Sequence, residues 1–145
     1  MTVRLYNTLT RQTEELIPLE PNKVGIYCCG PTVYDFQHIG NFKTFLFEDI
    51  LARTLRYAGY EVKHVMNITD VGHLAGDNDE GEDKMSLAMQ REKKKSEEIA
   101  EFCTSKFFED WDKLNLNRPT VVCKATDHIH EMIELIKRIE AAGYA

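Results

Sequence analysis

The sequence predicts an α/β fold in which helices cover a parallel β-sheet. The first observation is an almost uninterrupted apolar run over residues 24–29, closed by Gly30 and Pro31. Strands buried on both faces have this pattern, and parallel sheets are built from such strands. The second observation is a helical pattern over residues 41–58, followed by another strand pattern over residues 61–67. Strand, helix and strand in this order form a βαβ unit, whose two strands are parallel.

Length and composition exclude several other classes of protein. The chain has 145 residues, 43% hydrophobic and 29% charged, so it is long enough for one globular domain and unlike a disordered or collagen-like chain. Its 18 basic and 24 acidic residues give a net charge of −6, which argues against a general nucleic-acid coat protein. No run approaches the roughly 20 apolar residues of a membrane span, and the few, irregularly spaced cysteines favour a reducing, cytoplasmic location. These cysteines are Cys28, Cys29, Cys103 and Cys123.

Two structural units are predicted in the first half of the chain. Residues 3–19 contain two β-like runs and predict an N-terminal hairpin. Residues 24–70 hold the βαβ unit, and Gly59 supplies the stop residue expected after the last turn of its helix. The apolar positions of this helix are Phe42, Phe45, Leu46, Ile50, Leu55 and Ala58.

The second half of the chain is predicted to begin with a loop and to continue as helices. Residues 71–83 are rich in Gly, Asp and Glu and predict a mobile acidic loop. Residues 84–145 predict a helical region, with amphipathic helices over residues 96–114 and 128–142. The first of these helices is expected to turn Ile99, Phe102, Cys103, Phe107, Trp111 and Leu114 inward. The second is expected to turn Ile129, Met132, Ile133, Ile136 and Ile139 inward.

The residues best suited to chemistry lie between the first predicted strand and the helix that follows it. The start of a helix presents unpaired backbone N–H groups and a partial positive charge, which together attract phosphate. Gly40 would let a nucleotide approach the backbone, while His38 and Asn41 can each donate a hydrogen bond. Taken alone, a histidine at this place is more often a capping or packing residue, so both interpretations stay open on spacing alone.

Longer stretches of the chain are more specific than any single motif. They are LYNTLTRQTEEL, VGIYCCGPTVYDFQHIGN, YEVKHVMNITDVG, LNLNRPT and KATDHIHEMIELI. Together they resemble the cysteinyl-tRNA synthetase family of class I aminoacyl-tRNA synthetases. This resemblance implies the first half of a Rossmann-like class I catalytic core and the start of its connecting insertion. It also implies an ATP-dependent, AMP-forming cysteine–tRNA ligase with cysteine, tRNA(Cys) and ATP with Mg²⁺ as its substrates.

The resemblance also assigns roles to individual residues. His38, Gly40 and Asn41 stand at the ATP-binding signature of the family, usually written His-x-Gly-His, and His38 and Asn41 are the implied catalytic residues. Cys29, directly before Gly30-Pro31-Thr32, matches a zinc ligand that recognises the substrate thiol. Gly30 and Thr69 are implied to contact the substrate cysteine.

The other zinc ligands of the family lie further along a complete enzyme, so zinc is expected there and only weakly, if at all, in this chain. The neighbouring Cys28 should point to the opposite face of its strand and pack as a small apolar residue. Asn67 and Asp70, which flank Thr69, are equally suited to holding the strand end through side-chain hydrogen bonds.

Two other functions stay open at this point. A related cysteine ligase that acts on an amino-sugar acceptor would share the same zinc and nucleotide chemistry. A non-catalytic nucleotide-binding remnant would bind nucleotide or a partner without turnover. We expect the complete enzyme to be a monomer, and this chain to be inactive alone and to self-associate through an unfinished sheet edge.

Overall fold

The computed structural model describes residues 2–71 and 96–144. The predicted acidic loop at residues 71–83 and the start of the predicted helical region lie, except for Val71, outside the described residues. The N-terminal segment forms an antiparallel hairpin of β1 (Arg4–Asn7) and β2 (Gln12–Glu15). None of the described helices has the length and apolar character that a membrane span requires.

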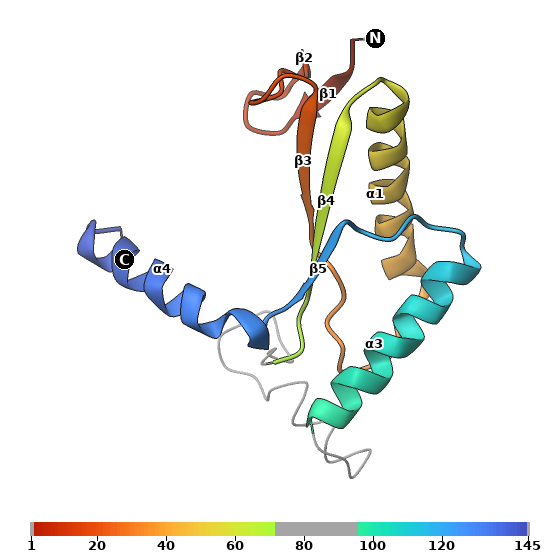
Figure 1. The fold of residues 1–145 in the computed structure, drawn as a ribbon, viewed down its shortest axis with the longest axis vertical. Coiled ribbons are helices and arrows are strands. Elements are labelled where there is room, and N and C mark those ends of the chain that lie inside the picture. The colour runs from red at the N-terminus through yellow and green to blue at the C-terminus, as the bar shows by residue number, and fades with distance from the viewer. Residues whose placement is uncertain (1, 72–95, 145) are drawn as a thin grey trace.

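The centre of the molecule is a parallel sheet of β3 (Lys23–Cys28), β4 (Glu61–Ile68) and β5 (Val121–Lys124), in that order (Figure 1). The helix α1 (Ile39–Tyr57) connects β3 to β4, and α3 (Ser96–Lys113) lies between β4 and β5 in the chain. The predicted α/β class with a parallel sheet is therefore confirmed.

The strand β5 was not predicted, because residues 84–145 were expected to be helical. Val121–Lys124 instead pairs in parallel with Val65–Ile68 of β4. Its sequence, VVCK, lacks the alternation of apolar and polar residues that identifies a strand. Its presence makes α3 part of a crossover between neighbouring parallel strands, as α1 is.

The carboxyl end of β3 lies against the backbone of β4. A Cβ atom built on Gly30 would stand 1.8 Å from the carbonyl oxygen of Asn67, far inside contact distance. The pairing then continues beyond the strands, since the N–H of Val33 donates to the carbonyl of Thr69 at 3.1 Å and the N–H of Thr69 donates to the carbonyl of Pro31 at 3.0 Å. Glycine is required at position 30 because no side chain fits between these two backbones.

The helix α1 buries a face that differs in part from the predicted one. Leu46 and Ile50 were predicted to be apolar core positions, but they are 44% and 53% exposed. Glu48 and Asp49 are buried in their place, at 8% and 3% exposure. The buried face of the helix consists of Phe42, Phe45, Glu48, Asp49, Ala52 and Leu55.

An aromatic cluster joins α1 to α3 above the sheet. The rings of Phe42 and Phe45 of α1 lie 5.6 and 5.1 Å from the ring of Phe107 of α3. Trp111 is fully buried, and its indole Nε1 donates to the carbonyl of Leu116 at 3.0 Å. Phe102 and Leu114, which were predicted to belong to the same buried face, are half exposed.

The helix α4 (Ile129–Ala141) leaves its apolar stripe uncovered. It follows a short 3₁₀ helix, Thr126–His128, and extends away from α1 and α3 (Figure 1). The prediction that its apolar residues point inward is wrong for the described part of the chain, because no described element packs over them. These residues, each between 37% and 53% exposed, are Ile129, Met132, Ile133, Ile136 and Ile139.

Replacing Phe107 with alanine is expected to destabilise the fold by about 3–5 kcal/mol, because the ring is 2% exposed and its loss opens a cavity in the aromatic cluster. The matched control is Phe47→Ala on α1, which removes the same ring from a side chain that is 66% exposed and should change stability by no more than about 0.5 kcal/mol. Urea unfolding followed by circular dichroism measures both free energies. Equal losses in the two variants would contradict the assignment of Phe107 to the core.

Gly30→Ala is expected to destabilise the fold by about 2 kcal/mol or more, because the added methyl group forces the end of β3 away from Asn67. Gly25→Ala is the control in the same strand, since a Cβ atom there has no neighbour within 4 Å, and it should be neutral or gain about 0.4–1 kcal/mol. Thermal and urea unfolding of the two variants test the difference. A Gly30→Ala variant as stable as Gly25→Ala would show that the close approach does not constrain the fold.

Candidate functional site

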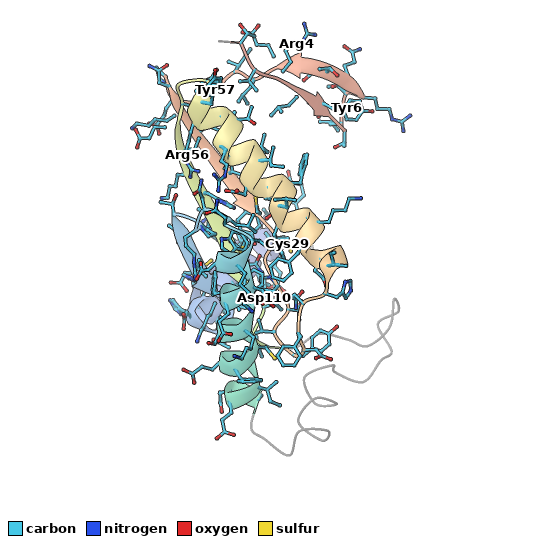
Figure 2. All side chains as sticks on the ribbon, turned by 90° about the vertical axis from the view of Figure 1, so that its right-hand side faces the viewer. Arg4, Tyr6, Cys29, Arg56, Tyr57 and Asp110 are labelled. Carbon is cyan, nitrogen blue, oxygen red and sulfur yellow. The ribbon has the colours of Figure 1, made fainter. Side chains whose placement is uncertain are left out.

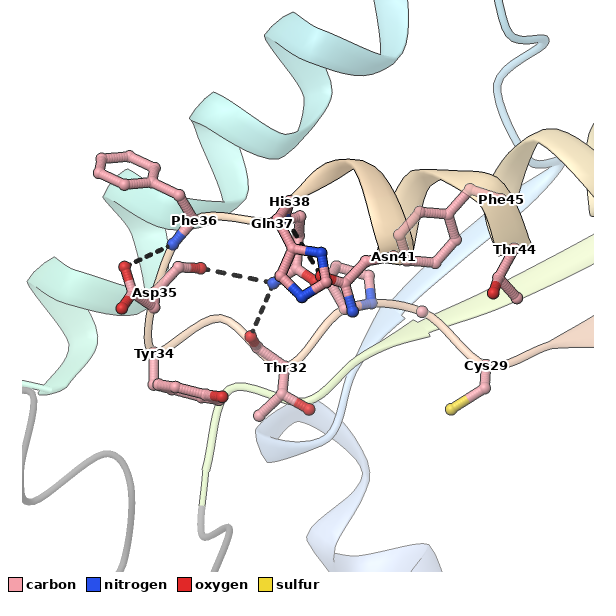
Figure 3. A pocket seen from close by; sticks show the side chains of 12 residues that line it. Cys29, Thr32, Tyr34, Asp35, Phe36, Gln37, His38, Asn41, Thr44 and Phe45 are labelled. Carbon is pink, nitrogen blue, oxygen red and sulfur yellow. Dashed lines mark hydrogen bonds between the residues drawn. The ribbon is translucent and has the colours of Figure 1, made fainter. Parts of the chain in front are cut away.

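A pocket of about 450 Å³ lies where β3 ends and α1 begins. This volume is in the range of small-molecule sites. Figure 3 shows its lining side chains, which include those of Cys29, His38 and Asn41. The described residues that line it are Cys29, Gly30, Pro31, Thr32, Tyr34, Asp35, Phe36, Gln37, His38, Asn41, Thr44 and Phe45.

The loop between β3 and α1 is held by hydrogen bonds at both ends. Its first residues continue the pairing with β4, as described above for Pro31 and Val33. Gln37 closes the loop on itself, because its side-chain Nε2 donates to the carbonyl of Thr32 at 3.1 Å (Figure 3). The pocket wall is therefore held by backbone pairing at the end near β4 and by the side chain of Gln37 at the end near α1.

His38 and Asn41 close a reciprocal capping box at the start of α1. The N–H of Gly40 donates to Nδ1 of His38 at 3.0 Å, and the N–H of His38 donates to Oδ1 of Asn41 at 3.2 Å. Because Nδ1 accepts a hydrogen bond, the proton of a neutral imidazole is on Nε2, which is left to donate to a ligand. The oxygen of the Asn41 amide is likewise used in the cap, which leaves its NH₂ group as a donor.

Gly40 has a structural reason to be glycine. A Cβ atom at this position would lie 2.7 Å from Cε1 and 2.9 Å from Nδ1 of His38. The absence of a side chain therefore allows the imidazole ring to fold back over the first turn of the helix. Gly40 itself is not among the lining residues of the pocket.

The adjacent cysteines face opposite sides of β3 and its extension. Cys29 is exposed and lines the pocket, whereas Cys28 is buried with 7% exposure.

In Figure 2, Arg4 and Tyr6 of the hairpin lie at one end of the molecule, well away from Cys29. The hairpin therefore takes no part in this pocket.

Asn67 and Asp70 hold the end of β4. The side-chain oxygen of Asn67 accepts hydrogen bonds from the N–H of Gly30 at 3.0 Å and from the hydroxyl of Tyr27 at 3.1 Å, and its Nδ2 donates to the hydroxyl of Thr69 at 3.0 Å. Asp70 accepts from both the N–H and the hydroxyl of Thr126, at 3.1 and 2.5 Å. These contacts agree with the interpretation that Asn67 and Asp70 hold the strand end through side-chain hydrogen bonds.

The zinc site implied by the resemblance is not assembled by the described residues. Zinc takes three or four ligands from a protein, and no group of three Cys, His, Asp or Glu side chains gathers around Cys29 within residues 2–71 and 96–144. Cys29 alone offers one thiolate.

The pocket brings together four of the predicted site residues: Cys29, Gly30, His38 and Asn41. Thr69 is not among the lining residues, because its backbone pairs with the loop and its hydroxyl accepts from Asn67. Sequence reasoning missed the lining residues Thr32, Gln37 and Thr44. The only available signal was their place in or just after the stretch from Cys29 to Asn41.

Comparisons with known proteins show the family to which the chain belongs. The cysteine–tRNA ligase of Treponema denticola is 59% identical over 144 residues, covering 99% of this chain and 29% of that protein. Those of Burkholderia lata and Zymomonas mobilis are 50% and 45% identical, covering 99% and 98% of this chain and 31% and 28% of their own lengths. The chain thus spans about three tenths of these relatives. The sequence model of the class I (C) tRNA synthetase catalytic domain matches residues 15–145, and the chain belongs to this family.

Proposed function

We propose that the chain is part of a cysteine–tRNA ligase and that its pocket binds ATP and the substrate cysteine. The observation that carries the proposal is the shared pocket: the thiol of Cys29 at the strand end and the donors of His38 and Asn41 at the helix start line one cavity. The names of the relatives, all at 45% identity or more, support cysteine as the amino acid and tRNA as the acceptor. This support favours the tRNA ligase over a ligase for an amino-sugar acceptor.

The proposed reaction has two steps. A carboxylate oxygen of cysteine attacks the α-phosphorus of ATP, so that a new P–O bond forms and pyrophosphate leaves. A ribose hydroxyl of tRNA(Cys) then attacks the carbonyl carbon of the adenylate, and AMP leaves. Mg²⁺ would accompany ATP as its counter-ion, and the site of reaction would be the cytoplasm, where translation takes place.

The residues of this chain would contribute position and hydrogen bonds. Nε2–H of His38 and the NH₂ of Asn41 can donate to phosphate oxygens at the start of α1, where the helix dipole favours negative charge. Charge develops on these oxygens as pyrophosphate leaves, and donors already held in place stabilise it without reorganising. The capping box supplies this preorganisation, because it fixes the orientation of both side chains.

We further propose that this chain alone does not complete a turnover. Within residues 2–71 and 96–144, its pocket is lined by residues from Cys29 to Phe45 and Cys29 has no further zinc ligands around it. Selection of cysteine through zinc and contact with tRNA would therefore need residues beyond those that line this pocket. Self-association of the chain, expected from its sheet edges β3 and β5, stays a prediction.

His38→Ala is expected to weaken ATP binding about tenfold, because it removes the Nε2–H donor to a phosphate oxygen. Isothermal titration calorimetry with ATP and Mg²⁺ measures the affinity. His130→Ala, which removes an exposed imidazole of α4 outside the pocket, is the matched control and should bind as the wild type does.

His38→Ser separates the ligand role of the imidazole from its capping role. Serine is a strong N-cap residue, and its side chain is too short to place a donor where Nε2 of His38 stands. This variant should therefore keep the stability of α1 and still lose about tenfold in ATP affinity. Circular dichroism and the same titration test both points. If His38→Ser bound ATP as tightly as the wild type, the imidazole would be a cap alone and its proposed role in ATP binding would be wrong.

A further inference from the structure

A second group of reactive side chains lies inside the molecule, between the sheet and α1. Cys28 of β3, Glu48 of α1 and His64 of β4 each place one potential ligand atom so that all three atoms lie within 4.8 Å of one another. Their exposed fractions are 7%, 8% and 1%. The alternation of the parallel strands puts Cys28 and His64 on the face that α1 covers. This group does not share a residue with the pocket at Cys29.

Two polar atoms of this group lack a hydrogen-bond partner among the described residues. The Cys28 thiol hydrogen-bonds to the Glu48 carboxyl group, but Oε2 of Glu48 and Nε2 of His64 are buried without a hydrogen-bond partner in the part of the chain that the structure describes. A buried polar atom without a partner costs about 1–3 kcal/mol. The neighbouring Asp49 has no such deficit, since it accepts from Nε of Arg53 at 2.6 Å and from the N–H of Asn117 at 3.1 Å.

Burial explains why these three groups resist ionisation when no cation is bound. Burial, together with the nearby Glu48 carboxylate, raises the pKa of the Cys28 thiol to about 12, and burial raises the pKa of Glu48 to about 7. Burial also lowers the pKa of His64, and the charge of Arg56 acts in the same direction. A divalent cation would reverse this balance, because one thiolate and one carboxylate neutralise its two charges and leave no net charge in the interior.

We propose that Cys28, Glu48 and His64 form a buried binding site for Zn²⁺ or a similar divalent transition-metal ion. Thiolate, imidazole and carboxylate are the three ligand types that zinc prefers, and three protein ligands with one open position suffice for a tetrahedral site. Zinc bond lengths place the ligand atoms of such a site about 3.5 Å apart. The ligand atoms of the present group, all within 4.8 Å of one another, would close to this spacing when the ion binds.

The bound ion would tie three elements together. Cys28, Glu48 and His64 come from β3, α1 and β4, the whole βαβ unit, and they lie between its two apolar clusters, one around Phe45 and Met66 and the other around Ala52 and Leu55. The role inferred for the ion is therefore structural, and it is separate from the recognition of substrate at Cys29.

Titration of the purified 145-residue chain with Co²⁺ tests the site, because Co²⁺ reports its ligands by absorption. We expect one ion per chain, with a thiolate-to-cobalt charge-transfer band in the near ultraviolet and the visible bands of tetrahedral Co²⁺. Cys28→Ser should abolish the thiolate band, and Glu48→Gln should weaken binding on the order of 100-fold, because each removes an anionic ligand. Cys29→Ser, the matched change one residue away, should retain the band.

A thermal measurement covers the case in which a variant folds poorly. Zn²⁺ should raise the melting temperature of the wild type and of Cys29→Ser, and should raise that of Glu48→Gln far less, because stabilisation follows affinity for the folded state. Three results would overturn the proposal: no tetrahedral Co²⁺ spectrum in the wild type, loss of the thiolate band in Cys29→Ser with retention in Cys28→Ser, or equal Zn²⁺ stabilisation of the wild type and Glu48→Gln.

Discussion

The close approach of Gly30 to the carbonyl group of Asn67 is the constraint on which the pocket depends. It brings the carboxyl ends of β3 and β4 together without a side chain between them. The side chain of Asn67 then receives the N–H of Gly30, and the pairing of Val33 with Thr69 carries the loop toward the start of α1. Each later feature of the pocket, the capping box included, begins from a loop whose first residues are fixed in this way.

The first turn of α1 and its middle lie in different environments. Its first turn faces the pocket with His38 and Asn41, while its middle places Glu48 and Asp49 in the interior. Asp49 is satisfied by Arg53 and by the backbone of Asn117, so its burial ties the helix to the segment after α3. Glu48 has no equivalent partner for one of its oxygens. A carboxyl group in that situation is either neutral or paired with a cation.

Sequence patterns were informative where local periodicity and final burial coincide. The strand β4 was recognisable because it is the central strand and its buried and exposed residues alternate. The apolar run that forms β3 was recognised as a strand, but it is an edge strand with Cys28 as its one buried residue, so the expected burial on both faces was wrong. The strand β5 was missed because it stands between two helical patterns and its residues do not alternate between apolar and polar. Periodicity also identified the apolar stripe of α4, yet it could not tell whether anything covers that stripe, since coverage is a property of tertiary packing. For the same reason the buried positions of Glu48 and His64 gave no signal in the sequence.

Cys28 and Cys29 illustrate how the alternation of a strand separates two chemistries. The expectation that they face opposite sides was met, because one lines the pocket and the other is buried. Cys28 is buried in the core as expected, and in addition its thiol hydrogen-bonds to the carboxyl group of Glu48, which the sequence did not indicate. The resemblance to the family assigns a role to Cys29 and none to Cys28. The partners of Cys28 come from α1 and β4, so its environment emerges only when the three elements are packed together.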